Sequence, residues 1–271
     1  MNNDAPKTIV ITGSTQGIGF GLAQELLKRG QKVVISGRSP TTLQQALQAL
    51  GAFSPNVAGA LCDVTRPQEH EQLFEFAQTT FGRVDIWVNN AGVAHPQEKV
   101  WQLAPETLQT VITTNVLGTL YGTRAAARAM LANGGGWIYN LEGFGANGRP
   151  RPGISVYGMT KAAVAFLNKS LIQELQGTPV KVAAIQPGMV ITHLVTAQYP
   201  NPADLERVRP IFNIIASRVS EVTPWLAESI LSNQKHGALL QFLPAWKLTL
   251  RFLTAPFSQR NVFDEQSKTN S

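Results

Sequence analysis

Thr12-Gly13-Ser14-Thr15-Gln16-Gly17-Ile18-Gly19 is the stretch that decides the fold of this chain of 271 residues. A β-branched run over residues 7–12 leads into it, and a helical pattern over residues 17–29 follows at once. In that context glycines make the tight turn, let the backbone approach a pyrophosphate, and allow the helix to pack closely on the strand. The helix amino terminus also presents free N–H groups and a positive dipole end to phosphates. The stretch therefore predicts a dinucleotide-binding turn.

The alternation of strand and helix continues as far as residue 188. Further strands are predicted at residues 32–36, 58–62, 86–89, 136–141 and 181–186, and further helices at residues 41–50, 67–81, 105–131 and 156–176. Strands buried on both faces and joined by helices favour an α/β fold, a Rossmann-like doubly wound parallel sheet flanked by helices. No linker or repeat interrupts the pattern, so we expect a single domain over residues 1–271. Residues 1–190 would form the dinucleotide-binding and catalytic core, and residues 191–271 an irregular substrate-specificity loop and C-terminal extension.

The composition excludes several functional classes. Hydrophobic residues make up 44% of the chain and charged residues 15%, which is an ordinary globular balance. The net charge of +6 suits an anionic partner, but no basic run with interleaved aromatic residues indicates nucleic-acid binding. No apolar run is long enough to span a bilayer, and the short segment before residue 7 leads us to expect no signal or transit peptide. We expect a cytoplasmic protein in which the lone Cys62 is a small buried residue.

Five later segments match, in order, the motifs that follow such a glycine turn in one enzyme family. They are Asp63, Asn89-Asn90-Ala91-Gly92, Asn115, Tyr157-Gly158-Met159-Thr160-Lys161, and Pro187-Gly188 with Thr192. Together with the spacing Gly-x-x-x-Gly-x-Gly, they resemble the short-chain dehydrogenase/reductase family over about residues 7–195. The resemblance implies an oxidoreductase that moves hydride between a nicotinamide and a carbonyl or alcohol.

The resemblance also implies which residues bind the cofactor. They are Gly13, Ser14, Gln16, Gly17, Ile18, Gly19, Arg38, Ser39, Asp63, Val64, Asn90, Ala91, Gly92, Tyr157, Lys161, Pro187, Gly188, Val190 and Thr192. The second strand ends in Ser36-Gly37-Arg38-Ser39, which contains no carboxylate. A carboxylate there would bind the ribose 2′-hydroxyl of NAD and repel a 2′-phosphate, whereas Arg38 can form a charge-assisted fork with that phosphate. We therefore expect NADP(H) as the cofactor.

Tyr157, Lys161 and Asn115 are the catalytic residues that the resemblance implies. Tyr157 would donate a proton to the carbonyl oxygen, Lys161 would bond the nicotinamide ribose, and Asn115 would hold the water of a proton relay. Tyr157 and Lys161 are four residues apart, so they share one face of a helix. A neighbouring ammonium and the charge of the oxidised nicotinamide would favour the phenolate and lower a pKa that is ordinarily about 10.

One member of the family's catalytic set is missing. The family usually places a serine about 13 residues before the tyrosine, and Phe144 stands at that position. No serine lies between Trp137 and Ile154, and Ser155 is expected to cap the helix that carries the tyrosine. Loss of a donor to a developing oxyanion costs on the order of 10²–10³ in rate. Either another donor substitutes for the serine, or the enzyme is impaired.

The sequence around this gap resembles the chlorophyll b reductase branch of the family. Asn140-Leu141-Glu142-Gly143-Phe144-Gly145 is similar to the Asn-Met-Asp-Gly-Ala-Gly stretch that replaces the serine there. The resemblance implies NADPH-dependent reduction of the 7-formyl group of chlorophyll b to a hydroxymethyl group. Glu142 takes the branch's acidic position. It would be a catalytic protonated acid aimed at the formyl oxygen, a carboxylate that shapes the pocket, or a solvated or salt-bridged loop residue.

The C-terminal stretch is apolar with two cations inside it. It holds Leu239, Leu240, Phe242, Leu243, Trp246, Leu248, Leu250, Phe252, Leu253 and Phe257 beside Lys247 and Arg251. Three interpretations stay open. The stretch would be an apolar lid over a flat tetrapyrrole, an interfacial segment at the periphery of an anionic photosynthetic membrane, or ordinary core and subunit interface.

Three functions stay open at this point. They are a reductase of a chlorophyll b-type pigment, an enzyme acting on another lipophilic aldehyde, ketone or alcohol such as retinal or a steroid, and a catalytically lapsed NADP-binding regulatory protein. Retention of Asn115, Tyr157 and Lys161 argues against the last. The helices over residues 107–131 and 156–176 form the usual interface in the family, so we expect a homodimer or homotetramer.

The histidines predict no metal site. His95 and His236 have no metal-ligand neighbours at useful spacing. His193, beside Thr192, would either touch the substrate or be a structural loop residue.

Overall fold

A seven-stranded parallel sheet forms the centre of the computed structural model, which describes residues 5–263. The strands lie in the order β3-β2-β1-β4-β5-β6-β9. Their bounds are β1 Thr8–Ile11, β2 Lys32–Gly37, β3 Val57–Leu61, β4 Ile86–Asn89, β5 Gly136–Leu141, β6 Val180–Gln186 and β9 Leu239–Gln241. A second, two-stranded sheet pairs β7 (Met189–Val190) with β8 (Ala216–Ser217). The strand order reverses at β1, which confirms the predicted Rossmann-like α/β fold.

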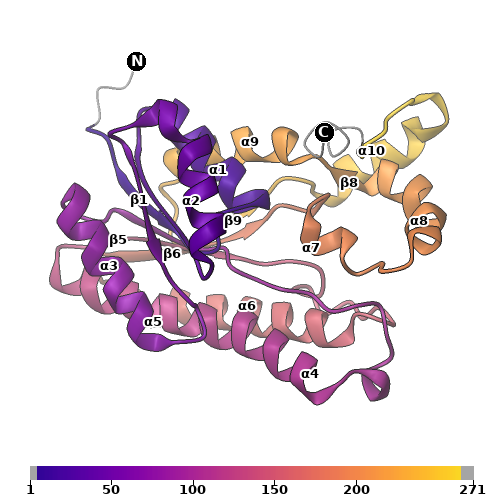
Figure 1. Cartoon of the computed structure of the whole chain (residues 1–271), viewed down its shortest axis with the longest axis horizontal. Helices are drawn as coiled ribbons and strands as arrows, with labels where there is room; N and C mark the ends of the chain where they lie inside the picture. The colour runs from indigo at the N-terminus through magenta and orange to yellow at the C-terminus, as the bar shows by residue number, and fades with distance from the viewer. Residues whose placement is uncertain (1–4, 264–271) are drawn as a thin grey trace.

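Helices cover both faces of the large sheet (Figure 1). One face carries α1 (Gly17–Lys28), α2 (Pro40–Ala49) and α9 (Val219–Ser232), and the other carries α3 (Pro67–Phe81), α5 (Gly118–Ala132) and α6 (Ser155–Glu174). The remaining α-helices are α4 (Pro105–Ile112), α7 (His193–Thr196), α8 (Pro202–Ile215) and α10 (Ala245–Thr254). Short 3-10 helices occupy Gly51–Phe53, Val100–Gln102 and Ala255–Phe257. Within residues 5–263, no helix has the length and apolar character needed to cross a membrane.

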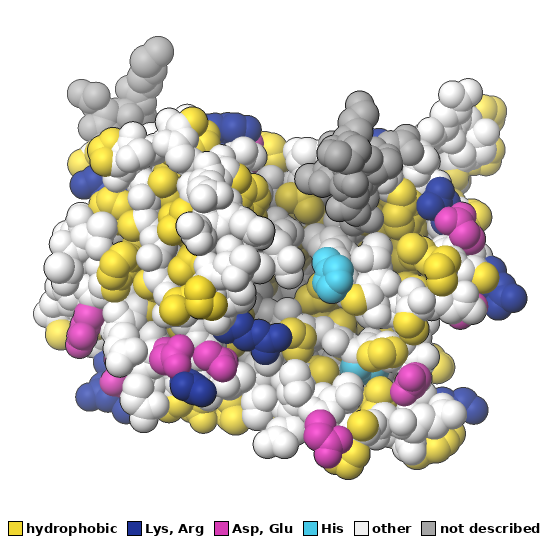
Figure 2. Space-filling model, viewed as in Figure 1, with side chains coloured by type: hydrophobic (Ala, Val, Ile, Leu, Met, Phe, Trp, Pro, Cys, Tyr) yellow, Lys and Arg dark blue, Asp and Glu magenta, His cyan; other side chains and the backbone are white. Residues whose placement is uncertain are grey.

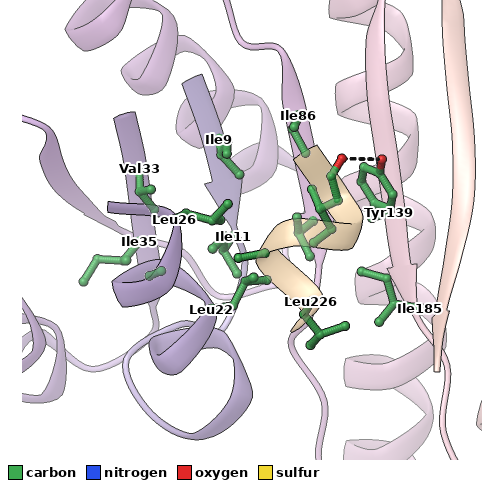
Figure 3. Packing of buried hydrophobic residues seen from close by; sticks show 14 of the residues in the cluster. Ile9, Ile11, Leu22, Leu26, Val33, Ile35, Ile86, Tyr139, Ile185 and Leu226 are labelled. Atoms are coloured by element: carbon green, nitrogen blue, oxygen red, sulfur yellow. Dashed lines mark hydrogen bonds between the residues drawn. The ribbon is translucent and has the colours of Figure 1, made fainter. Parts of the chain in front are cut away.

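Alternate strand residues fill the layers under these helices. Ile9 and Ile11 of β1 belong to the cluster that contains Leu22 of α1 and Leu226 of α9 (Figure 3). Val10, between them in the sequence, belongs to the opposite layer under α3, α5 and α6. This period of two is the pattern of a strand that is buried on both faces, so the apolar run predicted the core as well as the strand.

The predicted helix over residues 105–131 contains a π-helical turn. α4 ends at Ile112, the wider turn covers Thr113–Leu117, and α5 begins at Gly118. The turn contains Asn115, which is fully buried. One wide turn displaces the apolar spacing by a single residue, so the helical pattern did not reveal it. Such turns occur frequently at functional sites.

The segment after residue 188 is more regular than the sequence predicted. It contains three α-helices of ten residues or more, and β9 adds an edge strand that pairs with β6, Ala184 opposite Leu239. α8 was missed because its prolines resemble breaks. Pro202 occupies the first turn, where no N–H is needed, but Pro210 lies inside the helix. β9 was missed because it is short and has no buried residue.

Candidate active site

The glycine-rich turn packs against the segment that follows β4. A Cβ atom on Gly13 would lie 2.8 Å from Cα of Ala91, and one on Gly19 would lie 2.5 Å from Nδ2 of Asn90. That Asn90 amide donates to the carbonyl oxygens of Thr12 and Gly13, both at 2.9 Å. The backbone N–H groups of Asn90 and Ala91 donate to the Thr12 hydroxyl at 3.1 and 3.2 Å. The segment after β4 therefore fixes the shape of the turn.

The turn has the features that a dinucleotide needs. Gly13 and Gly17 both have φ +60°, a conformation that glycine adopts without strain. The N-cap residue of α1 is Gln16, and its side chain makes no capping hydrogen bond, which leaves the first N–H groups of the helix for a phosphate. A Cβ atom on Gly17 would lie 3.4 Å from Cγ2 of Thr192, so the segment after β6 borders the turn.

Some predicted cofactor residues use their side chains inside the protein. The buried Ser14 hydroxyl donates to the carbonyl oxygen of Ile11 at 2.7 Å and accepts the N–H of Ser36 at 2.9 Å. Val64 and Val190 are buried apolar residues. The backbone N–H of Ser14 also donates inside the protein, to the carbonyl oxygen of Ser36 at 2.8 Å. The cofactor contacts of these residues stay predictions.

The carboxyl ends of β2 and β3 bring Arg38 and Asp63 near each other. Arg38 is exposed and makes no hydrogen bond or ion pair with any of residues 5–263. Ser39 is the N-cap of α2, and its hydroxyl accepts a backbone N–H of that helix at 3.4 Å. Burial alone would raise the pKa of Asp63, but hydrogen bonds from Thr65 and the charges of Arg66 and Arg38 lower it overall. Arg38 is thus the cation available at this edge for a phosphate.

Tyr157 and Lys161 lie one turn apart on α6, beside the end of β5. The Lys161 ammonium is 5.9 Å from the centroid of the Tyr157 ring and donates to the carbonyl oxygen of Leu141 at 3.0 Å. Burial lowers the pKa of Lys161 to about 8, although the charge of Glu142 opposes that change. Burial also raises the pKa of Tyr157 to about 12. The predicted lowering of the tyrosine pKa is not found in the protein alone, because burial removes water from the phenol.

Asn115 joins the π turn to its surroundings. Its Oδ1 accepts the N–H of Val93 at 2.8 Å, and its Nδ2 donates to the Val93 carbonyl oxygen at 2.9 Å and to the Thr160 hydroxyl at 3.0 Å. A Cβ atom on Gly92 would lie 3.4 Å from Oδ1 of Asn115 and 3.7 Å from Nζ of Lys161. The structure therefore brings Asn115 and Lys161 together around Gly92, while a relay water held by Asn115 stays a prediction.

Gly143 is the residue that adjoins the Tyr157 hydroxyl. A Cβ atom on Gly143 would lie 2.6 Å from Oη of Tyr157, so the tyrosine hydroxyl occupies the space that a side chain here would need. Phe144, which takes the family's serine position by count, is exposed. The prediction that Ser155 caps α6 is wrong, because the helix begins one residue earlier than expected. Its N-cap is Ile154, and Ser155 is its first helical residue.

Glu142 is buried directly after β5. Its Oε1 accepts from Nδ2 of Asn168 at 2.9 Å, and its Oε2 accepts from Nε2 of Gln186 at 2.7 Å. The interpretation of Glu142 as a solvated or salt-bridged loop residue is therefore wrong, since it is 7% exposed and held by neutral amides. Asn168 and Gln186 were not among the predicted site residues.

His95 is a further residue that the sequence did not connect with the site. It is buried, with Nδ1 2.7 Å from the carbonyl oxygen of Pro96 and Nε2 3.4 Å from the backbone nitrogen of Tyr157. A carbonyl only accepts, so Nδ1 carries the hydrogen and Nε2 accepts the Tyr157 N–H. His193 is exposed at the start of α7. Across the described residues, no cluster of three His, Cys, Asp or Glu could hold a metal ion.

Cys62 is placed as the sequence predicted. It is buried in the layer under α3 and α5, and burial raises the pKa of its thiol to about 12. The thiol stays protonated at neutral pH and takes no part in the site.

Comparison with known proteins agrees with this geometry. Residues 7–203 match the short chain dehydrogenase family. The chain is 36% identical over 264 residues to a chloroplastic chlorophyll(ide) b reductase of Arabidopsis thaliana, covering 95% of this chain and 73% of that protein. It is 38% identical over 265 residues to a chloroplastic chlorophyll(ide) b reductase of Oryza sativa subsp. japonica, covering 95% and 74%. A solved serine dehydrogenase complexed with NADP+ is similar with a TM-score of 0.76 and 28% identity, covering 88% of this chain and 95% of that one.

The family match covers more than half of the chain, and it includes both the glycine turn and the Tyr157–Lys161 pair. The two plant relatives extend the similarity through β9 and the C-terminal segment. On this evidence the chain belongs to the short-chain dehydrogenase/reductase family and is an oxidoreductase.

Proposed function

We propose that the protein is an NADPH-dependent reductase that converts the formyl group of a chlorophyll b-type pigment to a hydroxymethyl group. The observation that carries this proposal is the pair Glu142 and Gly143, which stands beside Lys161 and Tyr157 where the family usually has a serine. Relatives that match 95% of the chain are chlorophyll(ide) b reductases. The absence of a side chain on Gly143 lets the Tyr157 hydroxyl lie directly against the backbone that follows β5.

The residues of the site suit reduction rather than oxidation. Tyr157 holds its proton at neutral pH, so its O–H group is a donor to a carbonyl oxygen. The Lys161 ammonium stabilises the phenolate that forms when the proton leaves. NADPH, when bound, supplies the hydride. The glycine turn and the amino terminus of α1 would hold its pyrophosphate, and Arg38 its 2′-phosphate.

The direct test is turnover of chlorophyllide b with NADPH, followed by pigment absorbance and by chromatography of the product. A 7-hydroxymethyl product is expected, and chlorophyllide a, which has a methyl group at that position, is the matched substrate control. If NADPH binds and no hydroxymethyl product forms, the pigment is not the substrate. The same assay would then be run with retinal and a ketosteroid.

Arg38→Ala is expected to weaken NADPH binding about 10- to 100-fold and to leave NADH binding unchanged. The reason is that a charge-assisted fork to the 2′-phosphate contributes about 1.5–3 kcal/mol, and NADH lacks that phosphate. Affinities would be measured by quenching of tryptophan fluorescence. Arg66→Ala is the matched control, because it removes an exposed neighbouring arginine whose guanidinium lies 3.4 Å from Glu69. Equal losses for the two cofactors would rule out Arg38 as the phosphate ligand.

We also propose that α10 rests on an anionic membrane surface. Four apolar residues share one side of α10 and of the short helix Ala255–Phe257: Trp246, Leu250, Leu253 and Phe257. All four side chains are exposed, and the exposed fraction is 69% for Leu253 and 91% for Phe257. Figure 2 shows hydrophobic side chains gathered at the corner of the molecule where α8 and α10 lie. An ordinary core segment would bury such residues.

The charge of this segment complements an anionic surface. No Asp or Glu occurs between Glu228 and Asp264 in the sequence. The Lys247 ammonium lies 5.5 Å from a ring centroid of Trp246. A tryptophan beside a lysine on an amphipathic helix is the combination that binds at headgroup level. Contact with a membrane at this helix would bring the enzyme to a pigment that is itself lipophilic.

Trp246→Glu is expected to lower the fraction of protein that sediments with anionic phosphatidylglycerol vesicles, with a partition coefficient about tenfold smaller. Trp101→Glu is the matched control, because Trp101 is 76% exposed and lies under Lys99 at 5.3 Å, as Trp246 lies under Lys247. Similar sedimentation of the two variants would contradict a membrane contact through α10. Binding to neutral phosphatidylcholine vesicles is expected to be weak for all three proteins.

We propose a homo-oligomer that forms through α5 and α6, as is usual in the family. Phe166 of α6 is 73% exposed, and Met159 of α6 and Leu131 of α5 are exposed as well. Light scattering that shows a monomer at micromolar concentration would contradict this assembly.

A further inference from the structure

A row of buried side chains crosses the interior from β4 to Glu142. The indole N–H of Trp87 donates to Oδ1 of Asn89 at 2.8 Å, and Nδ2 of Asn89 donates to Oδ1 of Asn140 at 2.7 Å. Nδ2 of Asn140 donates to Oδ1 of Asn168 at 2.7 Å, and Nδ2 of Asn168 donates to Glu142. All five side chains are buried. The row therefore links β4, β5 and α6 and ends at the active site.

The two ends of the row fix the direction of every amide in it. An indole only donates, so Asn89 presents its oxygen to Trp87, and each following amide presents its oxygen to the one before. The row consequently reaches Glu142 with an N–H group, and Gln186 offers another N–H group to the second oxygen. A protonated carboxyl would need an acceptor for its own hydrogen, whereas the row fixes Asn168 as a donor and Gln186 is oriented as a donor in this structure. This arrangement holds Glu142 as a carboxylate, and a protonated acid aimed at the substrate does not fit it.

Lys161 is the cation that faces this carboxylate. Lys161 and Asn168 are seven residues apart on α6, which places them on one face two turns apart. The Lys161 ammonium donates to the carbonyl oxygen of Leu141, the residue before Glu142. Within residues 5–263 the two charges form no ion pair at 4.0 Å or less, since each is hydrogen-bonded to neutral groups. The carboxylate acts on the ammonium through its field.

The other groups around Lys161 carry no charge at neutral pH. Tyr157, on the same helix, is protonated, and the segment after β4 contributes Gly92. The π turn contributes the neutral amide of Asn115. Glu142 is thus the charged group that opposes the effect of burial on Lys161.

We propose that Glu142 is a positioning residue, a fixed carboxylate that keeps the Lys161 ammonium charged and in place beside Tyr157. Both of its oxygens are occupied by Asn168 and Gln186, so it acts through Lys161 and does not touch the substrate. The row of amides holds the carboxylate at one point, because its donors are packed in the sheet and in α6. This inference deepens the proposed function at the same site and rests on it for its role in turnover.

The consequence is a defined pH range for the site. The charged form of Lys161 is fully present below its pKa of about 8 and is lost as the pH rises through that value. The Glu142 charge raises this pKa, so its removal lets burial lower the pKa further. Any step that needs the ammonium would then fail at a lower pH. In the wild type the basic limb of turnover is expected near pH 8.

The test follows Lys161 itself by NMR of lysine-labelled protein, with its ¹³Cε signal identified by Lys161→Arg. In Glu142→Gln, the midpoint of the Lys161 titration is expected to lie about one pH unit below that of the wild type. Glu174→Gln removes the same charge from the exposed C-terminal end of α6, and its Lys161 midpoint is expected to match the wild type. An unchanged Lys161 midpoint in folded Glu142→Gln would overturn the proposal.

A second measurement needs no variant. The carboxyl ¹³C shift of Glu142 in the wild type is expected to be that of an ionised group at pH 7, and the shift of a protonated carboxyl would overturn the proposal. Both measurements are independent of the substrate. If they succeed and chlorophyllide b is not reduced, the pigment is wrong and the role of Glu142 stands. If the pigment is reduced and the Lys161 midpoint is the same with and without Glu142, the pigment assignment stands and the role of Glu142 is wrong.

Discussion

Tyr157→Phe is expected to slow reduction of the formyl pigment by about 10³-fold, with a far smaller effect on NADPH affinity. The substitution removes only the O–H group, and loss of a positioned proton donor costs about 10²–10⁴ in rate. The ring that lies 5.9 Å from the Lys161 ammonium remains, so the packing of α6 is kept. Single-turnover rates with saturating NADPH and the NADPH dissociation constant would be measured side by side.

Tyr139→Phe provides the matched control, since it removes the same atom from a tyrosine outside the site. The Tyr139 hydroxyl donates to the carbonyl oxygen of Ile230 at 3.1 Å in the core (Figure 3). Its loss is expected to cost about 1 kcal/mol of stability and to leave the rate unchanged. If Tyr157→Phe kept a tenth or more of the wild-type rate, another group would have to be the proton donor.

Gly143→Ala is expected to lower the rate by about 10²-fold, the second largest effect. An added Cβ would lie 2.6 Å from the Tyr157 hydroxyl and 3.3 Å from Cγ of Lys161, so the hydroxyl must move. A displacement of about 1 Å at a reacting group costs on the order of 10²-fold. The same substitution tests whether the position can hold the side chain that the family usually has there. Turnover and NADPH affinity are the measurements, and only turnover is expected to change.

Gly51→Ala is the control for adding a methyl group. A Cβ atom on Gly51 has no heavy-atom neighbour within 4 Å beyond the adjacent residues, and the backbone there is not in the left-handed region. Wild-type turnover is expected. An active Gly143→Ala would show that Tyr157 can move aside without cost, which would contradict the tight contact.

The fold and the shape of the glycine turn could be predicted because each depends on local signals. The turn from Gly13 to Gly19 has a form typical of a strand–turn–helix unit, and buried strands such as Ile86–Asn89 show as apolar runs. Tyr157 and Lys161 could be paired because four residues along a helix return to the same face. These inferences need no knowledge of distant contacts.

The rest of the site depends on contacts between residues far apart in the sequence. Asn168 and Gln186 meet Glu142 across 26 and 44 residues, and nothing in their local sequence marks them. The missing serine could be noticed by counting, but counting indicated Phe144, whereas the structure places Gly143 beside the tyrosine. The raised pKa of Tyr157 likewise reflects burial by the whole fold.

β9 has a consequence for how the enzyme can change over evolution. β6 and β9 are adjacent, parallel strands, so the chain between Gln186 and Leu239 leaves the sheet and returns to its immediate neighbour. The sheet fixes both ends of this segment, and the entropic cost of closing such a loop grows only slowly with its length. α7 and α8 can therefore be exchanged, lengthened or reshaped while the strand ends that carry the chemistry stay fixed. A chimera that takes residues 193–215 from a relative with another substrate is expected to change specificity while Thr192 and the sheet stay in place.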